Sequence, residues 1–206
     1  MLEAALLSSV TGLLWVLSVS SWIVILYKTW WVWRVGRDVP LAQQAFWQAA
    51  DAVQACHALA LLDRQAVLLP LVQQAYPSTL LGGSDDADMP TADERLRGVL
   101  WSLRVVTRQI RWGQAWLACV AAAAPFVGLL GTVWGLMDAL GSLTQVDEVA
   151  WGTWVPVLSQ VLSLTGAGLV VALPALLAHQ LLAPSLDALQ QTLEDFAADL
   201  MAQVPA

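Results

Sequence analysis

The sequence predicts an all-α integral membrane protein that crosses the bilayer three times. Of its 206 residues, 58% are hydrophobic and 12% are charged, whereas a soluble domain carries about 25% charged residues. Three runs contain no Asp, Glu, Lys or Arg, and each is long enough for a bilayer crossing, which needs about 20 apolar residues. These runs cover residues 4–27, 112–137 and 149–186.

The distribution of basic residues predicts the orientation. All nine lie between Lys28 and Arg111. Because Lys and Arg collect on the cytoplasmic side of a membrane, the segment 28–111 is expected in the cytoplasm. The N-terminus is then periplasmic and the C-terminus cytoplasmic. Acidic residues nearly balance the basic residues of this segment, so it has no basic stripe. This balance argues against nucleic-acid binding.

The first span is predicted at residues 4–27. It ends at a cluster of aromatic and basic residues that begins with Tyr27 and Lys28 and continues to Arg34. Trp and Tyr favour the headgroup region, so this cluster indicates where the helix leaves the membrane. A cleaved signal peptide is a poorer interpretation, because the apolar region is too long and no basic residue precedes it.

The cytoplasmic segment is predicted to be helical. Pro40 is expected to open a helix over residues 41–76, which Pro70 should kink or end. Residues 77–90 are rich in Gly, Pro, Ser and Asp and predict a loop. Thr91 and Glu94 have the spacing of a capping box, which predicts a helix start. No breaker follows, so one helix is expected from 92 to 140, with the second span at 112–140.

The second span has a face of small residues. Gly128, Gly131 and Gly135 recur every three to four residues, and Gly131 and Gly135 form a GxxxG pair. Small residues at this spacing let a second helix approach closely, so packing is the general interpretation of this face.

The remainder of the chain is predicted as a periplasmic loop at 141–153, a third span at 154–179 and a cytoplasmic C-terminal helix at 180–206. The third span carries a second set of small residues, Gly166 and Gly168. In the C-terminal segment, apolar residues recur at helical spacing and predict an amphipathic helix. They are Leu186, Leu189, Leu193, Phe196 and Leu200.

No catalytic motif, metal site or cofactor site is predicted. The sequence has no phosphate-binding loop, dinucleotide fingerprint or nucleophile elbow, so the protein is not expected to be an enzyme. Cys56 and Cys119 fall in different predicted compartments and are not expected to pair. His57 and His179 have no second ligand at helical spacing, and each is expected as a surface or interfacial polar residue.

A small polar set remains within the spans. Counted inward from the loop at 141–153, Thr132 and Thr165 fall at similar depth on the small-residue faces. Two hydroxyls at matched depth indicate a polar path, although a single intramembrane Thr usually bonds its own helix. Gln160 lies nearer the outer end of its helix. Asp138 is a possible acid at the outer mouth, although such boundary acids more often reach water.

These residues carry a family resemblance. The segment APFVGLLGTVWGLM, residues 124–137, resembles the second-span motif of the TolQ/ExbB/MotA proton-channel family, in its ExbB and TolQ branch. Pro156 with LTGAGLVVALPA, residues 164–175, is similar to the third-span pattern, and residues 18–34 are similar to the first span and its exit. Three spans disfavour the MotA-type stators, which have four.

The resemblance implies a homopentamer in the bacterial inner membrane, with a pore lined by spans two and three. A single-span ExbD-like or TolR-like partner would sit in that pore, and its aspartate would carry protons. Proton flow would drive a periplasmic TonB-like or TolA-like transducer. Thr132 and Thr165 match the family's path-lining threonines.

The sequence departs from the branch at Gln160, where a glutamate is frequent. Glutamine does not ionise, so the proton carrier is expected on the partner. An alternative from another class is a non-conducting scaffold ring that has lost coupling. A third alternative, an unrelated three-span packing protein, is disfavoured by the second-span motif. The cargo, and the choice between H⁺ and Na⁺, stay open at this point.

Overall fold

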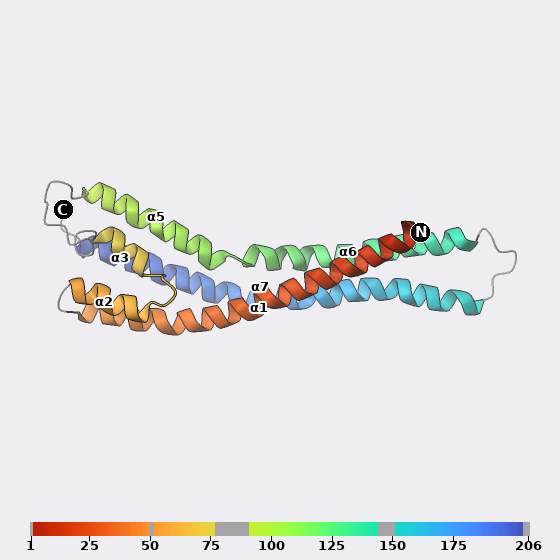
Figure 1. The fold of residues 1–206 in the computed structure, drawn as a ribbon, viewed down its shortest axis with the longest axis horizontal. Helices are drawn as coiled ribbons and strands as arrows, with labels where there is room; N and C mark the ends of the chain where they lie inside the picture. The colour runs from red at the N-terminus through yellow and green to blue at the C-terminus, as the bar shows by residue number, and fades with distance from the viewer. Residues whose placement is uncertain (1, 50–51, 77–90, 144–150, 204–206) are drawn as a thin grey trace. The chain divides into compact units, whose positions relative to one another are not determined.

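The computed structural model describes residues 2–49, 52–76, 91–143 and 151–203, and this part of the chain is almost entirely helical (Figure 1). The helices are α1 (Leu2–Gln48), α2 (Ala52–Leu62), α3 (Leu69–Ala75), α5 (Ala92–Arg111), α6 (Gln114–Leu143) and α7 (Trp151–Gln203). They form two compact units. The first unit comprises Met1–Lys28 and Gly113–Leu181, and the second comprises Thr29–Trp112 and Leu182–Ala206.

Three helical stretches are long and apolar enough to cross a membrane. They are Ser8–Gln48, Ala92–Gly141 and Leu158–Ala202. This confirms the prediction of three long apolar helices and fits an integral membrane protein. The expected periplasmic loop at 141–153 lies mostly outside the described residues, as does the loop at 77–90.

The prediction of one helix over 41–76 is wrong. Helix α1 continues through Pro40 to Gln48, and α2 and α3 follow as separate helices. Pro40 removes one backbone hydrogen bond, but Val39, Ala42 and Phe46 around it are buried. This buried face keeps α1 packed in the second unit. Pro70 lies in the first turn of α3, where a missing N–H costs little.

Asp63 holds the connection between α2 and α3. Its carboxylate accepts hydrogen bonds from the backbone N–H groups of Val67, Leu68 and Leu69, at 3.0, 2.6 and 2.8 Å. The side chain is only 7% exposed. Three N–H bonds satisfy a buried carboxylate that would otherwise be costly, and they stop the chain from continuing as one helix.

The predicted unbroken helix over 92–140 is also interrupted. Helix α5 ends at Arg111, and α6 begins at Gln114. Between them Gly113 has φ +89°, a left-handed conformation that glycine adopts at little cost. A Cβ at Gly113 would also lie 3.1 Å from Cγ1 of Val24 on α1. Gly113 is therefore the breaker that the sequence analysis missed.

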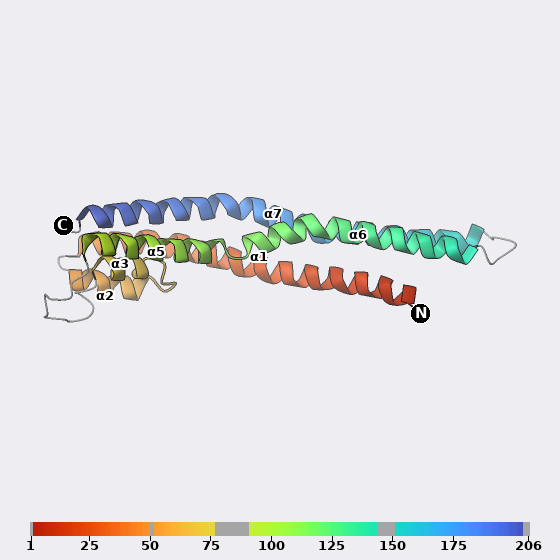
Figure 2. The same ribbon diagram turned by 90° about the horizontal axis from the view of Figure 1, so that it is seen from above.

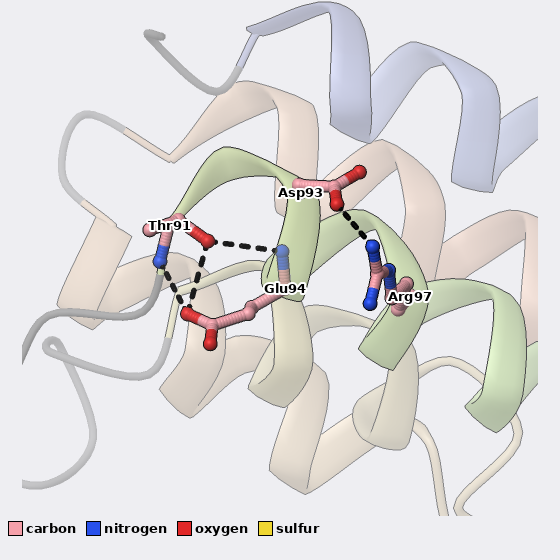
Figure 3. A network of polar contacts seen from close by, with 4 residues as sticks. All are labelled: Thr91, Asp93, Glu94 and Arg97. Atoms are coloured by element: carbon pink, nitrogen blue, oxygen red, sulfur yellow. Dashed lines mark hydrogen bonds and ion pairs between the residues drawn. The ribbon is translucent and has the colours of Figure 1, made fainter.

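The start of α5 confirms the predicted capping box (Figure 3). The Glu94 N–H donates to Oγ1 of Thr91 at 3.4 Å, and the Thr91 N–H donates to Oε2 of Glu94 at 2.8 Å. The Thr91 N–H, and after it the Thr91 hydroxyl, lowers the pKa of the Glu94 carboxyl group. Asp93 and Arg97 form an ion pair one turn apart on the same helix.

The second unit has a core of large side chains. The ring of Phe196 on α7 packs edge-on against Phe46 and Trp47 of α1, with centroids 5.4 and 5.8 Å apart. The five apolar residues predicted for an amphipathic C-terminal helix are all buried, which confirms that pattern. They belong to the same continuous helix as the predicted third span, because α7 is unbroken from Trp151 to Gln203.

The first unit consists of the N-terminal part of α1, helix α6 and the N-terminal part of α7. Helices α6 and α7 run side by side in both views (Figures 1 and 2). Their direction is antiparallel, because Ala124 approaches Gly168 whereas Gly128, one turn later, also approaches Leu164. A smaller buried cluster joins the three helices. Its members are Val10, Leu14, Leu117, Val120, Ala124, Ala172 and Ala175.

Candidate polar site between α6 and α7

Glycines bring the backbones of α6 and α7 together. A Cβ added at Gly128 would lie 2.7 Å from the carbonyl oxygen of Leu164, and one at Gly168 would lie 2.6 Å from that of Ala124. Real Cβ atoms do not approach so closely, and the atoms that they would meet are backbone. Such close approach allows helices to pack in a membrane, where the hydrophobic effect does not drive helices together.

The other predicted packing glycines have different surroundings. A Cβ at Gly131 would meet Cγ1 of Val10 on α1 at 3.0 Å and Cδ1 of Leu164 on α7 at 3.3 Å. Gly135 is buried. Gly166 has open space where its Cβ would be, with nothing from the described residues within 4 Å. Within this chain, Gly166 therefore does not pack helices together.

The structure brings Thr132 and Thr165 into direct contact. The Thr165 hydroxyl donates to the Thr132 hydroxyl oxygen at 3.3 Å, and Thr132 donates to the carbonyl oxygen of Leu129 at 2.7 Å. Thr132 is 9% exposed. The hydroxyl pair is a polar point between two apolar helices, and Thr165 keeps lone pairs that can accept another hydrogen bond.

Gln160 and Asp138 do not join this pair. Both residues are exposed, and among the described residues the structure shows no hydrogen bond from either side chain to Thr132 or Thr165. The backbone carbonyl of Gln160 accepts from the Ser163 hydroxyl at 2.6 Å. Of the four polar residues predicted for the spans, only the two threonines contact each other in the described helices.

Two polar side chains have buried atoms that were not recognised from the sequence. The side-chain Oε1 and Nε2 of Gln114, on α6, and Nδ1 of His179, on α7, are fully buried without a hydrogen-bond partner among the described residues. His179 is only partly exposed, as expected for an interfacial residue, and its Nδ1 is the buried atom. Gln114 precedes Leu117, Ala121, Ala124 and Gly128 at helical spacing, and this spacing would have placed it on the inner face.

Neither the two cysteines nor other possible metal ligands form a site among the described residues. Cys56 is buried, Cys119 is exposed, and both are free thiols. Burial raises the pKa of the Cys56 thiol, which reduces its reactivity. Among the described residues, no group of three His, Cys, Asp or Glu side chains is arranged to hold a metal ion.

Three long apolar helices, two of which pack through glycines around a hydroxyl pair, define a polytopic membrane protein of the helical-bundle class. The match to known families is more specific. The chain belongs to the MotA/TolQ/ExbB proton channel family, whose model matches residues 72–195. This match includes α5, α6 and both threonines, and it confirms the resemblance noted in the sequence.

Individual relatives agree with this assignment. The biopolymer transport protein ExbB of Salmonella typhimurium is 28% identical over 89% of this chain and 75% of its own length. The Tol-Pal system protein TolQ of Pseudomonas aeruginosa is 30% identical over 79% of this chain and 71% of its own. The ExbB of Neisseria gonorrhoeae is 37% identical over 48% of this chain, and the match covers 45% of that protein.

Proposed function

We propose that this chain is the channel subunit of a proton-driven membrane motor. Together with a single-span ExbD-like or TolR-like partner, it couples the proton motive force to work on a TonB-like or TolA-like transducer. Family membership supports the class of activity. The observation that carries the proposal for this chain is the hydrogen bond between Thr165 and Thr132 on the glycine-packed helices α6 and α7.

The proposed assembly is a homopentamer in the bacterial inner membrane, with the N-terminus periplasmic and the C-terminus cytoplasmic. In this arrangement α6 and α7 line the pore, and the proton-carrying aspartate belongs to the partner. The confinement of all basic residues to 28–111 supports the orientation. Because Gln160 does not ionise, this chain provides hydroxyl groups rather than a carboxylate.

The threonine pair has a defined role in this mechanism. When the partner's aspartate loses its proton, the carboxylate needs hydrogen-bond donors in a site that excludes bulk water. Two hydroxyls are suitable, because each can turn from acceptor to donor as the charge appears. A hydrogen bond to a charged group contributes about 1.5–3 kcal/mol, which corresponds to about one to two orders of magnitude in rate.

Replacement of Thr165 with Val tests the proposal, because Val removes the hydroxyl at nearly constant volume. We expect proton flux through the subunit and its partner, measured in liposomes with a pH-sensitive dye, to fall at least about tenfold. Thr165→Ser should retain most of the flux. Ser163→Ala is a matched control, since Ser163 is exposed on the same helix and bonds only its own backbone.

Two outcomes would overturn parts of the proposal. Full flux in Thr165→Val would remove the threonine pair from the proton path. Absence of flux in the unchanged protein, after purification with its partner and confirmation of a ring by native mass, would instead indicate a non-conducting scaffold. Copurification in mild detergent is therefore the first step, because it establishes which partner is present.

A further inference from the structure

Gln114 and His179 form a second polar position in the first unit. Both polar atoms of the Gln114 side chain are buried without a partner among the described residues, and so is Nδ1 of His179. A buried polar group without a hydrogen bond costs about 1–3 kcal/mol. One polar ligand bound by both residues would satisfy these buried atoms together.

The helix register places these two residues opposite each other. Ala124 faces Gly168, and Gly128 faces the stretch from Leu164 to Gly168. Continuing this antiparallel register from Ala124 toward the start of α6 brings Gln114 to the level of His179. Both residues also lie on the inner faces. On α6, Leu117 and Ala124 are buried at helical spacing from Gln114, and on α7, Ala172 and Ala175 are buried at helical spacing from His179.

Helix α1 brings a charged group close to the start of α6. A Cβ at Gly113, the residue before Gln114, would lie 3.5 Å from Cε of Lys28, and Lys28 is only 2% exposed. Helix α6 has no charged residue before Asp138, and α7 has none before Asp187. Lys28 is thus the titratable group that faces this end of the unit from the helices packed there.

The position is far from the threonine pair. Eighteen residues separate Gln114 from Thr132 along α6, or about 27 Å at 1.5 Å per residue. The hydrocarbon core of a bilayer is about 30 Å thick. The two polar positions therefore lie well apart along α6.

We propose that Gln114 and His179 bind a water molecule between α6 and α7, and that His179 is a protonatable group at this end of the unit. A buried water needs two to four polar partners. The Gln114 amide offers both a donor and an acceptor, and the imidazole nitrogen can be either. Histidine is also the side chain that changes charge near neutral pH.

Within the proposed function, on which this second role rests, His179 relays protons to and from the bound water. The bound water passes one proton to Nδ1 of His179 as it accepts another, and the imidazolium ion then releases the proton from Nε2, so the protons balance and no other reactant is needed. The water site itself does not depend on proton transport.

A double-mutant cycle tests the shared site without any transport assay. Gln114→Leu, His179→Phe and the double variant are compared by thermal unfolding of the full chain in detergent. We expect each single variant to lower Tm by about 2–4 °C, with the double variant no less stable than the single ones, because both polar groups are then gone. Strictly additive losses would overturn the shared site. His57→Phe is the control, since His57 is exposed.

Nuclear magnetic resonance provides a second test that tolerates a weakened fold. The chain has two histidines, so imidazole ¹⁵N labelling gives signals from two side chains only, and His57 serves as the internal reference. We expect Gln114→Leu to shift the imidazole ¹⁵N signals of His179 and to leave those of His57 unchanged. Unchanged His179 signals would contradict the proposed contact through water.

Proton flux then separates this proposal from the proposed function. His179→Gln retains a polar side chain that does not titrate, and we expect it to change the pH dependence of the flux in liposomes. Thr165→Val should lower the flux at every pH. The double-mutant cycle could show coupling between Gln114 and His179 while His179→Gln leaves the pH dependence of the flux unchanged. That result would support the water site and contradict the proton-exchange role.

Discussion

The two units of this chain use different side chains to pack their helices. In the first unit, glycine and alanine bring backbones into contact, as at Gly128 and Gly168. In the second unit, aromatic and aliphatic side chains fill the core around Phe196. The exposed residues of the two units also differ in polarity. Phe126 of the first unit is 71% exposed, whereas all four ion pairs among the described residues lie in the second unit.

The proposed location of the first unit in lipid and of the second in water would account for this difference. In water, burial of a large apolar side chain stabilises a fold by about 1.5–3 kcal/mol. In lipid, the surroundings are as apolar as the core, so helices associate through close packing and a few hydrogen bonds. One chain therefore follows two packing rules, and a helix such as α7 contributes residues to both units.

The largest effect should come from the aromatic core of the second unit. Phe196→Ala is expected to destabilise this unit by about 3–5 kcal/mol, because a buried ring is lost and a cavity remains. Amide hydrogen exchange of residues 182–203 measures this local stability. Phe126→Ala is the matched change in the first unit, and we expect it to have little effect on stability. Equal losses from both changes would contradict the comparison.

Small residues should be the sensitive positions of the first unit. Gly128→Ala places a methyl group against the Leu164 carbonyl oxygen, and we expect a loss of about 1–3 kcal/mol from overpacking. In the second unit, Gly36 has nothing within 4 Å of an added Cβ. There Gly36→Ala should stabilise α1 by about 0.5–1 kcal/mol. Thermal unfolding in detergent compares the two, and a stabilised Gly128→Ala would refute the close packing.

Surface charges of the second unit should contribute little. Arg111 and Asp187 form an ion pair at 2.8 Å, and both side chains are 56% exposed. Arg111 also donates to Gln190. Because exposed pairs are screened, Asp187→Asn should cost no more than about 1 kcal/mol. Thermal unfolding at low and high salt checks this, and the difference between Asp187→Asn and the unchanged protein should disappear in high salt.

The smallest expected effect is a pH dependence at the start of α5. The pKa of Glu94 is lowered in the folded chain by the bonds from Thr91. The stabilisation is therefore present above the unfolded pKa of about 4.3 and is lost as the pH falls through the lower folded value. Hydrogen exchange of the first turn of α5 should accelerate in this range. Glu94→Gln does not titrate at this position, so retention of the same pH dependence in that variant would contradict the assignment.

The spacing of residues in the sequence predicted much of the candidate site. Charge-free runs indicated three long helices, and helical periodicity placed Thr132 with Gly128 and Thr165 with Gly168 on inner faces. The breaks at Gly113 and around Asp63 were missed. The first depends on a single backbone angle, and the second depends on hydrogen bonds from nearby N–H groups to one carboxylate, which helical periodicity does not reveal. Gln114 was missed for a related reason. Its burial depends on a neighbouring helix, and a glutamine at the end of an apolar run is also compatible with the surface.

By itself, the sequence determined the all-α class, the long apolar helices, the family and the capping box at Thr91. These properties depend on composition and on neighbours within a few residues along the chain. Only the tertiary structure decided that Thr165 bonds Thr132, that Gly166 faces open space and that polar atoms of Gln114 and His179 are buried. Each of these depends on the rotation and register of one helix against another, which are set by the fit of side chains across the interface.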